Sequence, residues 1–506
     1  MTWQPFAAMA ETHSAVVFFA GDHAYKLKKP VRLGFLDFST PAARAAACAR
    51  ETELNRRFAP DVYLGVAELR DQDGQVCDHF VVMRRMPGSR RLSALVEAGE
   101  PADPEVRHVA RILAAEHATA SRSGQISEQG SRDAIRQRWH DNMGELCAAA
   151  ADDLIHKSDI DEAGRLADRF LAGREQLFDA RIRSGYVVDG HGDLLADDIF
   201  CLDDGPRILD CLDFDDQLRW LDGLDDAAFL AMDLEQLGAA GLAEQFTRWY
   251  SEYSGDPAPV ALRHHYVAYR AVVRAKVECI RARQGEPAAA GDARRLLAAA
   301  LRHLRAGAVT LVLVGGPPGT GKSTLAGALA DRLGFTVLSS DRIRKELAGL
   351  APEQGLTGDY GSGIYTEAWT ERTYAEMVSR AAGLLVLGES VVLDATWTSA
   401  RHRQAAADAA GRATADLVQL RCAIPARLAA RRTASRTGSA SDATPAIAER
   451  LAAEQEPWPA AVVIDTSPEA TTAGQRPDPV ARALEAVRPH GAEHVWRPVR
   501  PYMTPD

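Results

Sequence analysis

The segment Gly316–Ser323 has the sequence GPPGTGKS, which fits the pattern GxxxxGK[ST]. An apolar stretch precedes it and a helical pattern follows it, which is the setting of a phosphate-binding loop. Glycines allow successive backbone N–H groups to surround a phosphate chain, and the N-terminus of the following helix adds partial positive charge. Lys322 would reach the outer phosphates, and the Ser323 hydroxyl would bind magnesium. The sequence therefore predicts a nucleotide-binding P-loop.

Two aspartates end strand-like segments after this loop. Asp394 closes VVLD, where a carboxylate at the end of a strand would face the P-loop and could order the magnesium shell. Asp341 closes TVLSSD and is followed by Arg342 and Arg344. It could accept a proton from a substrate hydroxyl, with the arginines binding an anionic acceptor. Alternatively, Asp341 caps the helix that follows it, and the two roles can coexist.

A basic segment, PARLAARRTASR, has a helical pattern and carries Arg427, Arg431, Arg432 and Arg436. For any one of them, the alternative is a place on a solvated basic face. Residues 307–470 resemble the zeta-toxin-like and polynucleotide-kinase-like small P-loop kinases in GPPGTGKST, SSDRIRKEL, VVLDAT and RTASR. The resemblance implies an acceptor-side carboxylate and a lid helix whose arginines neutralise charge on the transferring phosphoryl group. The residues implied are Asp341 for the acceptor, Arg432 and Arg436 for the lid, and Gly316, Gly319, Thr320, Gly321, Lys322, Ser323 and Thr324 for the nucleotide.

A second set of acidic residues lies in the N-terminal half. Residues 191–200 read HGDLLADDIF, and residues 212–216 read LDFDD. Phosphoryl transfer to a hydroxyl needs one carboxylate that orients the acceptor and others that hold magnesium. Asp193 would be the base, and Asp198 and Asp213 would be metal ligands because magnesium prefers hard oxygen ligands.

Residues 10–285 resemble the aminoglycoside phosphotransferase family, the small-molecule relatives of protein kinases. The family's HGDLHxxNI is matched at His191, Gly192, Asp193, Leu194 and Ile199, and its D[FW] pair at Asp213 and Phe214. The resemblance further implies a strand lysine that contacts nucleotide phosphates, a helix glutamate that pairs with it, and a structural aspartate. These fall on Lys26, Glu51 and Asp226.

Three departures from that family bear on activity. Leu195 stands where the family has histidine, and Asp198 stands where it has asparagine. The second change keeps a metal-binding oxygen but adds a charge beside two other carboxylates, which could raise a pKa or demand a second cation. No GxGxxG segment is present to cover the phosphates. The hairpin that contains Lys26 would have to do so.

The elements predicted around these motifs define an α/β plus α+β chain. The first 90 residues read as a small antiparallel sheet with one helix at 42–58, and helical patterns dominate from 104 to 283. After residue 309, strands alternate with helices, which predicts a parallel sheet. We expect a protein-kinase-like domain at 1–285, a linker helix at 286–306, a P-loop kinase domain at 307–475 and a tail at 476–506.

Composition excludes several classes of protein. The 506 residues are 46% hydrophobic and 25% charged, as in ordinary globular proteins. A net charge of -11 argues against tight binding of long nucleic acids, although short ends need few contacts. The seven cysteines show no CxxC spacing, which favours free thiols. The N-terminus has no signal-like segment, so we expect a cytoplasmic protein without a membrane partner.

Together, the two motif sets resemble bacterial fusions of an aminoglycoside phosphotransferase with an ATP-binding domain. The resemblance implies a phosphotransferase (kinase) that uses ATP and Mg2+ and acts on an alcohol group of a small hydroxylated acceptor, a sugar or amino sugar. Asp215 and Asp216 near the catalytic loop would suit a cationic acceptor, or form a solvated turn. The alternatives are a nucleotide-sensing regulatory protein with a degenerate N-terminal lobe, and a nucleic-acid end kinase.

Overall fold

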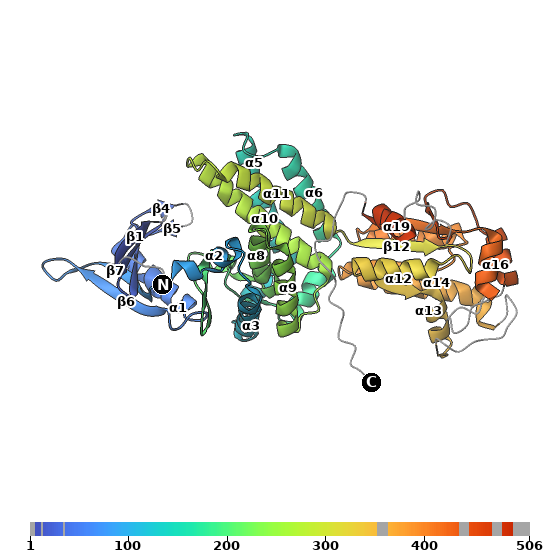
Figure 1. The fold of residues 1–506 in the computed structure, drawn as a ribbon, viewed down its shortest axis with the longest axis horizontal. Coiled ribbons are helices and arrows are strands. Elements are labelled where there is room, and N and C mark those ends of the chain that lie inside the picture. The colour runs from blue at the N-terminus through green and yellow to red at the C-terminus, as the bar shows by residue number, and fades with distance from the viewer. Residues whose placement is uncertain are drawn as a thin grey trace. The chain divides into compact units, whose positions relative to one another are not determined.

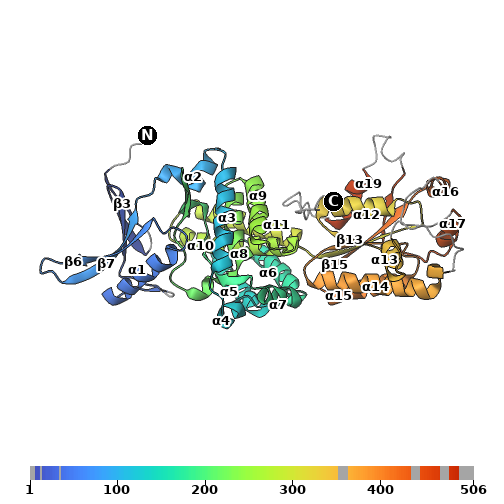
Figure 2. The same cartoon turned by 90° about the horizontal axis from the view of Figure 1, so that it is seen from below.

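The computed structural model describes residues 6–11, 14–33, 36–351, 363–434, 445–467 and 478–488. The chain forms two compact units, each assembled from several stretches of sequence, and Figures 1 and 2 show their elements. Unit 1 contains residues 1–155, 178–258 and 266–297, and unit 2 contains residues 156–177, 259–265 and 298–506. The linear domain boundaries given above stay a prediction.

Unit 1 begins with a five-stranded antiparallel sheet. In sheet order, its strands are β1 (Ala7–Glu11), β2 (Ala15–Ala20), β3 (His23–Lys28), β7 (Val76–Arg84) and β6 (Tyr63–Arg70). A two-residue turn at Gly21 and Asp22 joins β2 to β3, and Gly21 has φ of 55°, in the left-handed region that favours glycine. A small pair, β4 (Arg32–Leu33) and β5 (Leu36–Asp37), follows.

Helix α1 (Pro41–Asn55) covers one face of this sheet. Thr40 caps it by accepting a hydrogen bond from the Ala43 N–H at 3.2 Å, and proline at the first position starts it. Its Cys48 packs with Val81 and Met83 of β7. Lys26 and Lys28 are two residues apart on β3, so they point to the same face of the sheet.

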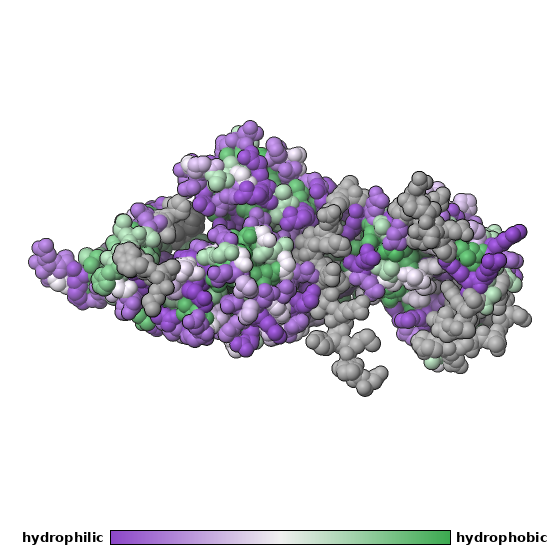
Figure 3. Space-filling model, in the orientation of Figure 1, coloured by the Kyte–Doolittle hydropathy of each residue, from purple (hydrophilic) through white to green (hydrophobic). Residues whose placement is uncertain are grey.

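The opposite face of the sheet exposes apolar side chains. Met9 and Phe18, on β1 and β2, face each other in register and are both exposed, and Phe80 of β7 meets Phe18 edge to face at 6.3 Å. Figure 3 shows hydrophobic surface at this end of the molecule.

The rest of unit 1 is helical, with two small antiparallel strand pairs on either side of the acidic motifs. One pair is β8 (Val187–Asp189) with β11 (Trp220–Asp222), and the other is the hairpin of β9 (Ile199–Leu202) and β10 (Gly205–Ile208). The helices include α2 (Leu92–Glu97), α3 (Asp103–Thr119), α4 (Gly124–Gln129), α5 (Arg132–Ala150), α8 (Gly223–Gln236) and α9 (Ala240–Ser254). They also include most of α7 (Glu175–Arg183) and α10 (Val260–Arg283), whose first residues belong to unit 2. Short 3-10 turns occupy Gly88–Arg90, Ala196–Asp198 and Asp216–Leu218.

Unit 2 is built on a five-stranded parallel sheet. Its order is β13 (Thr336–Ser339), β14 (Val391–Asp394), β12 (Thr310–Gly315), β15 (Asp416–Ala423) and β16 (Val462–Asp465). The central strand β12 is buried at all six residues, as its apolar run requires. The helices of unit 2 are α6 (Lys157–Ala172), α12 (Lys322–Leu333), α13 (Ser340–Leu347), α14 (Glu367–Val386), α15 (Ala400–Arg412), α16 (Ala426–Ala434), α17 (Pro445–Ala453) and α19 (Pro479–Val487). Helix α11 (Ala289–Ala306) belongs to unit 1 up to residue 297 and to unit 2 after it.

Helices cover both faces of this parallel sheet. Val312 and Val314 of β12 pack with Leu325 and Leu329 of α12 and with Val487 of α19. Figure 2 shows α12 and α19 over one face and α14 and α15 over the other. The predicted fold class, a kinase-like α+β part followed by an α/β P-loop domain, is confirmed.

Residues 156–177, from the N-terminal half of the sequence, are part of unit 2. Arg169 forms an ion pair with Asp416 at the start of β15. The buried Arg174 donates a hydrogen bond to the Ala413 carbonyl at 2.5 Å. Gly173 lies so close to that carbonyl that a Cβ would clash with it. This early segment is therefore closely fitted to the turn between α15 and β15.

The cysteines and the apolar character of the helices bear on two further expectations, free thiols and the lack of a membrane partner. All seven cysteines are free, five of them buried. Within the described ranges, the structure has no helix with the length and apolar character that crossing a membrane requires.

Candidate active sites

The P-loop joins β12 to α12, and its backbone can be formed only with glycine. Gly316, Gly319 and Gly321 have φ of 135°, 86° and 85°. A Cβ on Gly316 would lie 2.7 Å from the Cys422 carbonyl oxygen, and one on Gly319 would lie 2.5 Å from that of Ala429. Gly321 caps α12 without a side chain, so the first N–H groups of the helix are available to an anion.

The side chains that follow this loop lie at the carboxyl edge of the sheet. Lys322 is 8% exposed, whereas Ser323 and Thr324 are open to solvent in the first turn of α12. Asp394 ends β14 and is in register with Val314 of β12 and Ser339 of β13. The structure therefore brings the P-loop, Asp394 and the start of α13 together at one edge, where ligands of open parallel sheets bind.

Asp341 lies inside α13 and does not cap it. The cap residue is Ser339, and Asp341 is the second helical residue, so the capping alternative is wrong. An acidic residue in the first turn is still favoured by the helix dipole. Arg342 is exposed, while Arg344 is 7% exposed and lies one turn along the helix from Asp341.

A fixed loop follows Asp394. The Tyr374 hydroxyl hydrogen bonds with the Thr396 hydroxyl and accepts from the Trp397 N–H, each at 3.1 Å. Trp397 is fully buried with φ of 55°, a strained value for a residue with a side chain. The surroundings of Trp397 thus determine a backbone conformation that the residue would not adopt by itself.

The predicted lid helix is α16. Arg432 donates to the Thr466 carbonyl at 3.1 Å, and the Thr466 hydroxyl donates to the Thr320 carbonyl at 2.5 Å. This chain of contacts connects the lid helix to the P-loop. Arg427 and Arg431 are exposed, and Arg436 lies outside the described residues.

In unit 1, two lysines of β3 share one glutamate. Lys26 Nζ lies 2.8 Å from Glu51 Oε1, and Lys28 Nζ lies 2.7 Å from Glu51 Oε2. Glu51 is 1% exposed. Burial acts to raise the pKa of Glu51, but the two lysines outweigh burial and lower it. The sequence identified the pair Lys26–Glu51 and missed Lys28, although its spacing of two on the same strand is a signal for it.

Each of these two lysines also contacts one aspartate. Lys26 contacts Asp210 at 3.0 Å, and Lys28 contacts Asp213 at 2.7 Å. Burial, together with the nearby charges of Asp210 and Asp193, raises the pKa of Asp198 well above its ordinary value. Asp210 therefore lies close to Asp198 and Asp193. It is a candidate metal ligand, together with Asp198, that the sequence analysis did not identify. Its signal is the repeated LD in ILDCLDF.

Asp193 is a carboxylate with a raised pKa. Burial raises its pKa to about 6, and the charge of Arg274 on α10 opposes this shift. Within the described part of the chain, its carboxylate makes no hydrogen bond or ion pair. Arg270, one turn before Arg274, donates to both carboxylate oxygens of Asp225, at 2.7 and 3.0 Å. Arg274 is thus the more accessible cation near Asp193.

The loop around Asp193 is fixed from behind by Asp226. The N–H groups of His191 and Gly192 donate to the two oxygens of Asp226 at 2.6 and 2.9 Å. His117 contacts the same carboxylate at 3.1 Å. The ring of His191 is fully buried and hydrogen bonds to the Leu209 carbonyl at 3.0 Å. Both residues hold the loop in place.

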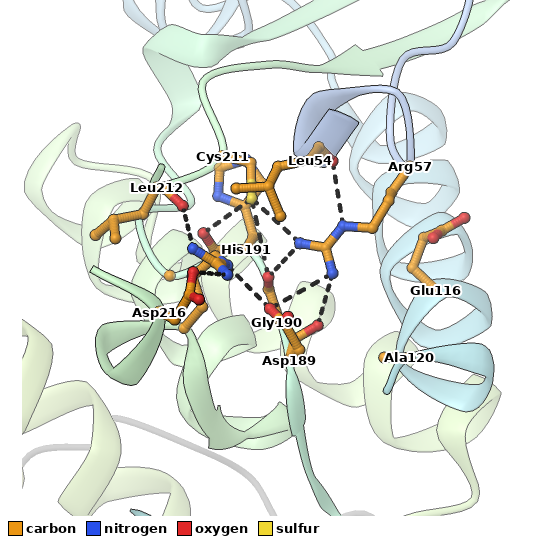
Figure 4. Close-up of polar contacts among 12 residues, drawn as sticks. Leu54, Arg57, Glu116, Ala120, Asp189, Gly190, His191, Cys211, Leu212 and Asp216 are labelled. Atoms are coloured by element: carbon orange, nitrogen blue, oxygen red, sulfur yellow. Dashed lines mark hydrogen bonds and ion pairs between the residues drawn. The ribbon is translucent and has the colours of Figure 1, made fainter. Parts of the chain in front are cut away.

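Figure 4 shows how Arg57, just after α1, is tied to the same loop. Arg57 donates to the carbonyls of Asp189 and Gly190 at 2.9 and 2.8 Å. Arg219 donates to the Asp189 carboxylate at 2.9 Å and to Asp216 at 2.6 Å. Asp216 is therefore already paired, as it also contacts Arg50 at 3.0 Å. Asp215 accepts from the Gln217 N–H and caps the turn that follows it. The role of both aspartates toward a cationic acceptor stays a prediction.

Magnesium fits both sites only as a partly protein-bound ion. Among the residues that the structure describes, no three histidine, cysteine or acidic side chains cluster closely enough to hold a metal. In nucleotide sites, however, magnesium uses one or two carboxylates together with phosphates and water. Asp198 and Asp210 in unit 1, and Asp394 at the edge of the sheet that carries the P-loop in unit 2, can supply that number of carboxylates.

Comparisons with known proteins find a domain family, full-length relatives and distant structural neighbours. A family model described as an AAA domain matches residues 311–457. Uncharacterized protein Rv2004c of Mycobacterium tuberculosis is 45% identical over 497 residues, which covers 98% of this chain and 97% of that protein. Among solved structures, a choline/ethanolamine kinase family protein from Mesorhizobium loti is 16% identical, with a TM-score of 0.36, over 60% of this chain and 94% of that one. A gluconokinase from Sinorhizobium meliloti 1021 is 20% identical, with a TM-score of 0.24, over 35% and 94%.

The likeness to the mycobacterial protein extends over nearly the full length of both chains. The chain belongs to the same family, in which a part resembling aminoglycoside phosphotransferases is followed by a P-loop domain.

Proposed function

We propose that the protein is a phosphotransferase that uses ATP and magnesium and phosphorylates a hydroxyl group of a small acceptor. The observation that carries the proposal is the meeting of the P-loop, Asp394 and Asp341 at one edge of the parallel sheet of unit 2. The kinase-like arrangement of Lys26, Glu51 and Asp193 in unit 1 supports a second site of the same kind.

In unit 2, the N–H groups at the start of α12 and the Lys322 ammonium bind the β- and γ-phosphates. Asp341 takes the proton of the acceptor hydroxyl as its oxygen forms a bond to the γ-phosphorus. The bond from that phosphorus to the bridging oxygen breaks, and its electron pair leaves with ADP. Arg432 neutralises charge on the phosphoryl group during transfer. Magnesium, held by Ser323 and Asp394, would offset the charge of the phosphates.

In unit 1, Asp193 takes the acceptor proton. A carboxyl with a pKa of about 6 is mostly ionised at neutral pH and is a stronger base than an ordinary aspartate. Lys26 holds the phosphates, and Glu51 fixes the lysine. Asp198 and Asp210 would be the magnesium ligands. A sugar is the acceptor class that we propose for this site.

Magnesium-dependent ATP consumption by four proteins tests the proposal: wild type, Asp193→Ala, Lys322→Ala and the double variant. Each is tested with sugars, amino sugars, sugar acids and nucleic-acid 5′ ends. We expect acceptor-stimulated turnover that the double variant loses. Loss in Asp193→Ala alone assigns the acceptor to unit 1, and loss in Lys322→Ala alone assigns it to unit 2. Nucleotide binding without stimulated turnover by any acceptor would contradict the proposal and favour a nucleotide sensor.

A further inference from the structure

A cavity of about 430 Å3 lies beside the P-loop in unit 2. Its walls come from Pro317 and Pro318, from the end of β15, and from α16 and α17, which Figure 2 shows at the end of the sheet. The prolines have no N–H group, so this side of the loop offers no backbone donor from them to a phosphate. Lys322 and Ser323 do not line the cavity. Thr320 of the P-loop does line it. The cavity therefore adjoins the phosphate site at Thr320 and lies outside the two side chains that would bind the phosphates and magnesium.

Two polar atoms in this lining have no hydrogen-bond partner in the described part of the chain. They are Nε of Arg421, on β15, and Oε1 of Gln455, just after α17, and both atoms are buried. Much of the remaining lining is apolar, and includes Ile424 and several alanines. A buried donor and a buried acceptor without partners are each costly to the fold, and native structures rarely keep such groups without a reason.

The orientation of the Gln455 amide is fixed by its own contacts. Its Nε2 donates to the carbonyls of Trp397 and Glu456 at 3.1 and 3.3 Å. Since the nitrogen is held by carbonyl oxygens, the amide oxygen is left as an acceptor. Trp397 belongs to the strained loop that follows Asp394. The cavity is thereby linked to the carboxyl edge of the sheet, where the phosphoryl group would be transferred.

We propose that this cavity binds the phosphate acceptor of unit 2, and that the acceptor is a small polyhydroxylated anion. Its acidic group pairs with the Arg421 guanidinium, and one of its hydroxyl groups donates to Gln455 Oε1. A guanidinium prefers a carboxylate or phosphate, and an unpartnered amide oxygen needs a donor. This inference rests on the function proposed above. Asp341 does not line the cavity, so the hydroxyl that reacts with it is one at the end of the acceptor away from Arg421.

Binding of three six-carbon compounds to the full-length protein tests the proposal by calorimetry. Gluconate, glucose and glucosamine have similar size and differ in charge, so their order reports the charge that the cavity prefers. We expect gluconate to bind at least about tenfold more tightly than the other two, since a hydrogen bond to a charged group contributes more than a neutral one. ATP consumption should be stimulated by gluconate in the Asp193→Ala variant, in which only unit 2 is active.

Variants of the two polar residues separate their roles. Arg421→Gln should remove the preference for gluconate, and Arg421→Lys should keep part of it because the charge remains. Gln455→Met should weaken gluconate and glucose alike. Arg412→Gln and Gln404→Met, which change exposed side chains on α15, serve as matched controls and should change neither affinity. All variants should keep wild-type affinity for ATP and the wild-type melting temperature.

Three results would overturn the proposal. One is a preference for glucosamine, which the exposed Glu449 at this cavity could produce. Another is a gluconate preference that survives Arg421→Gln. The third is a loss of ATP affinity in a folded Arg421→Gln protein, because the cavity would then belong to the nucleotide. The binding measurements do not require turnover. They can therefore contradict this proposal without contradicting the phosphotransferase activity, and the activity can be absent while the binding result supports this proposal.

Discussion

Lys28 lies 2.7 Å from Glu51, the same glutamate that Lys26 binds through its other oxygen. Lys28 is almost fully buried and also contacts Asp213 at 2.7 Å, whereas Lys26 contacts Asp210. One lysine therefore joins the sheet, α1 and the Asp213 segment, and the other is closer to the catalytic carboxylates. This division predicts different consequences for the two substitutions.

Lys28→Met should destabilise unit 1 by roughly 3 to 5 kcal/mol. The Asp213 carboxylate and one oxygen of Glu51 would lose the cation that offsets the cost of burying them. Lys26→Met should cost less stability and more nucleotide affinity. Urea titration followed by circular dichroism measures the first effect. Binding of ATP in a Lys322→Ala background measures the second. A Lys28→Met protein with unchanged stability would contradict this assignment.

Asp210→Asn should raise the magnesium concentration needed for Asp193-dependent turnover by about tenfold or more, since it removes a charged ligand beside Asp198. Asp213→Asn is the matched comparison and should change the magnesium requirement less, because its carboxylate pairs with Lys28. Magnesium titrations of both variants in a Lys322→Ala background test the difference. Equal effects would show that the two aspartates are equivalent.

The carboxylate of Asp226 should make the stability of unit 1 sensitive to acid. Burial acts to raise its pKa, but hydrogen bonding from His117 and the charges and N–H group around it lower the pKa below the ordinary aspartate value. A group with a lowered folded pKa stabilises the protein above its unfolded pKa, about 3.9, and loses that contribution as pH falls further.

Wild type should therefore exceed Asp226→Asn in unfolding free energy at pH 7 and at pH 5, and the gap should narrow below about pH 4. Urea titrations of both proteins at pH 7, 5 and 3.5 give the comparison. A gap that is constant over this range would mean that the charge of Asp226 does not supply the stability.

Arg57→Ala should loosen the catalytic loop of unit 1. It removes two hydrogen bonds to the carbonyls of Asp189 and Gly190, which costs about 1 to 3 kcal/mol, and it should lower Asp193-dependent kcat. Arg50→Ala, on α1, removes a more exposed ion pair with Asp216 and should cost less than about 1 kcal/mol. Denaturant titration with steady-state kinetics of both variants separates the roles.

Gly319→Ala should abolish ATP binding by the P-loop. An added Cβ would meet the Ala429 carbonyl at 2.5 Å, at a φ of 86° that alanine avoids. Gly327→Ala is the control, because a Cβ there meets nothing within 4 Å and the residue lies within α12. It should keep ATP affinity and gain up to about 1 kcal/mol. Titration with a fluorescent nucleotide in an Asp193→Ala background measures the nucleotide affinity of both variants.

The local motifs could be predicted from the sequence, and the pairings between distant segments could not. The P-loop is a continuous segment whose glycines and helix start define its structure. The partnership of Lys26 with Asp210 joins residues 184 positions apart, and no local pattern reports it. Asp213 was placed by the resemblance of a short motif, and that motif cannot show which of two neighbouring aspartates faces Asp198. The cap at Ser339 was missed because three polar residues in a row offered equivalent starts.

The inclusion of residues 156–177 in unit 2 has a consequence for how the protein is made. During synthesis this segment leaves the ribosome long before Ala413 and Asp416, the residues that Arg174 and Arg169 contact. Arg174, which is buried in the folded protein, therefore lacks its Ala413 partner until the second half of the chain has been made. A chain that ended near residue 285 would lack these contacts altogether. The two halves of the chain therefore have to be made as one polypeptide. Recombination that exchanged one half would separate residues 156–177 from the residues that they contact.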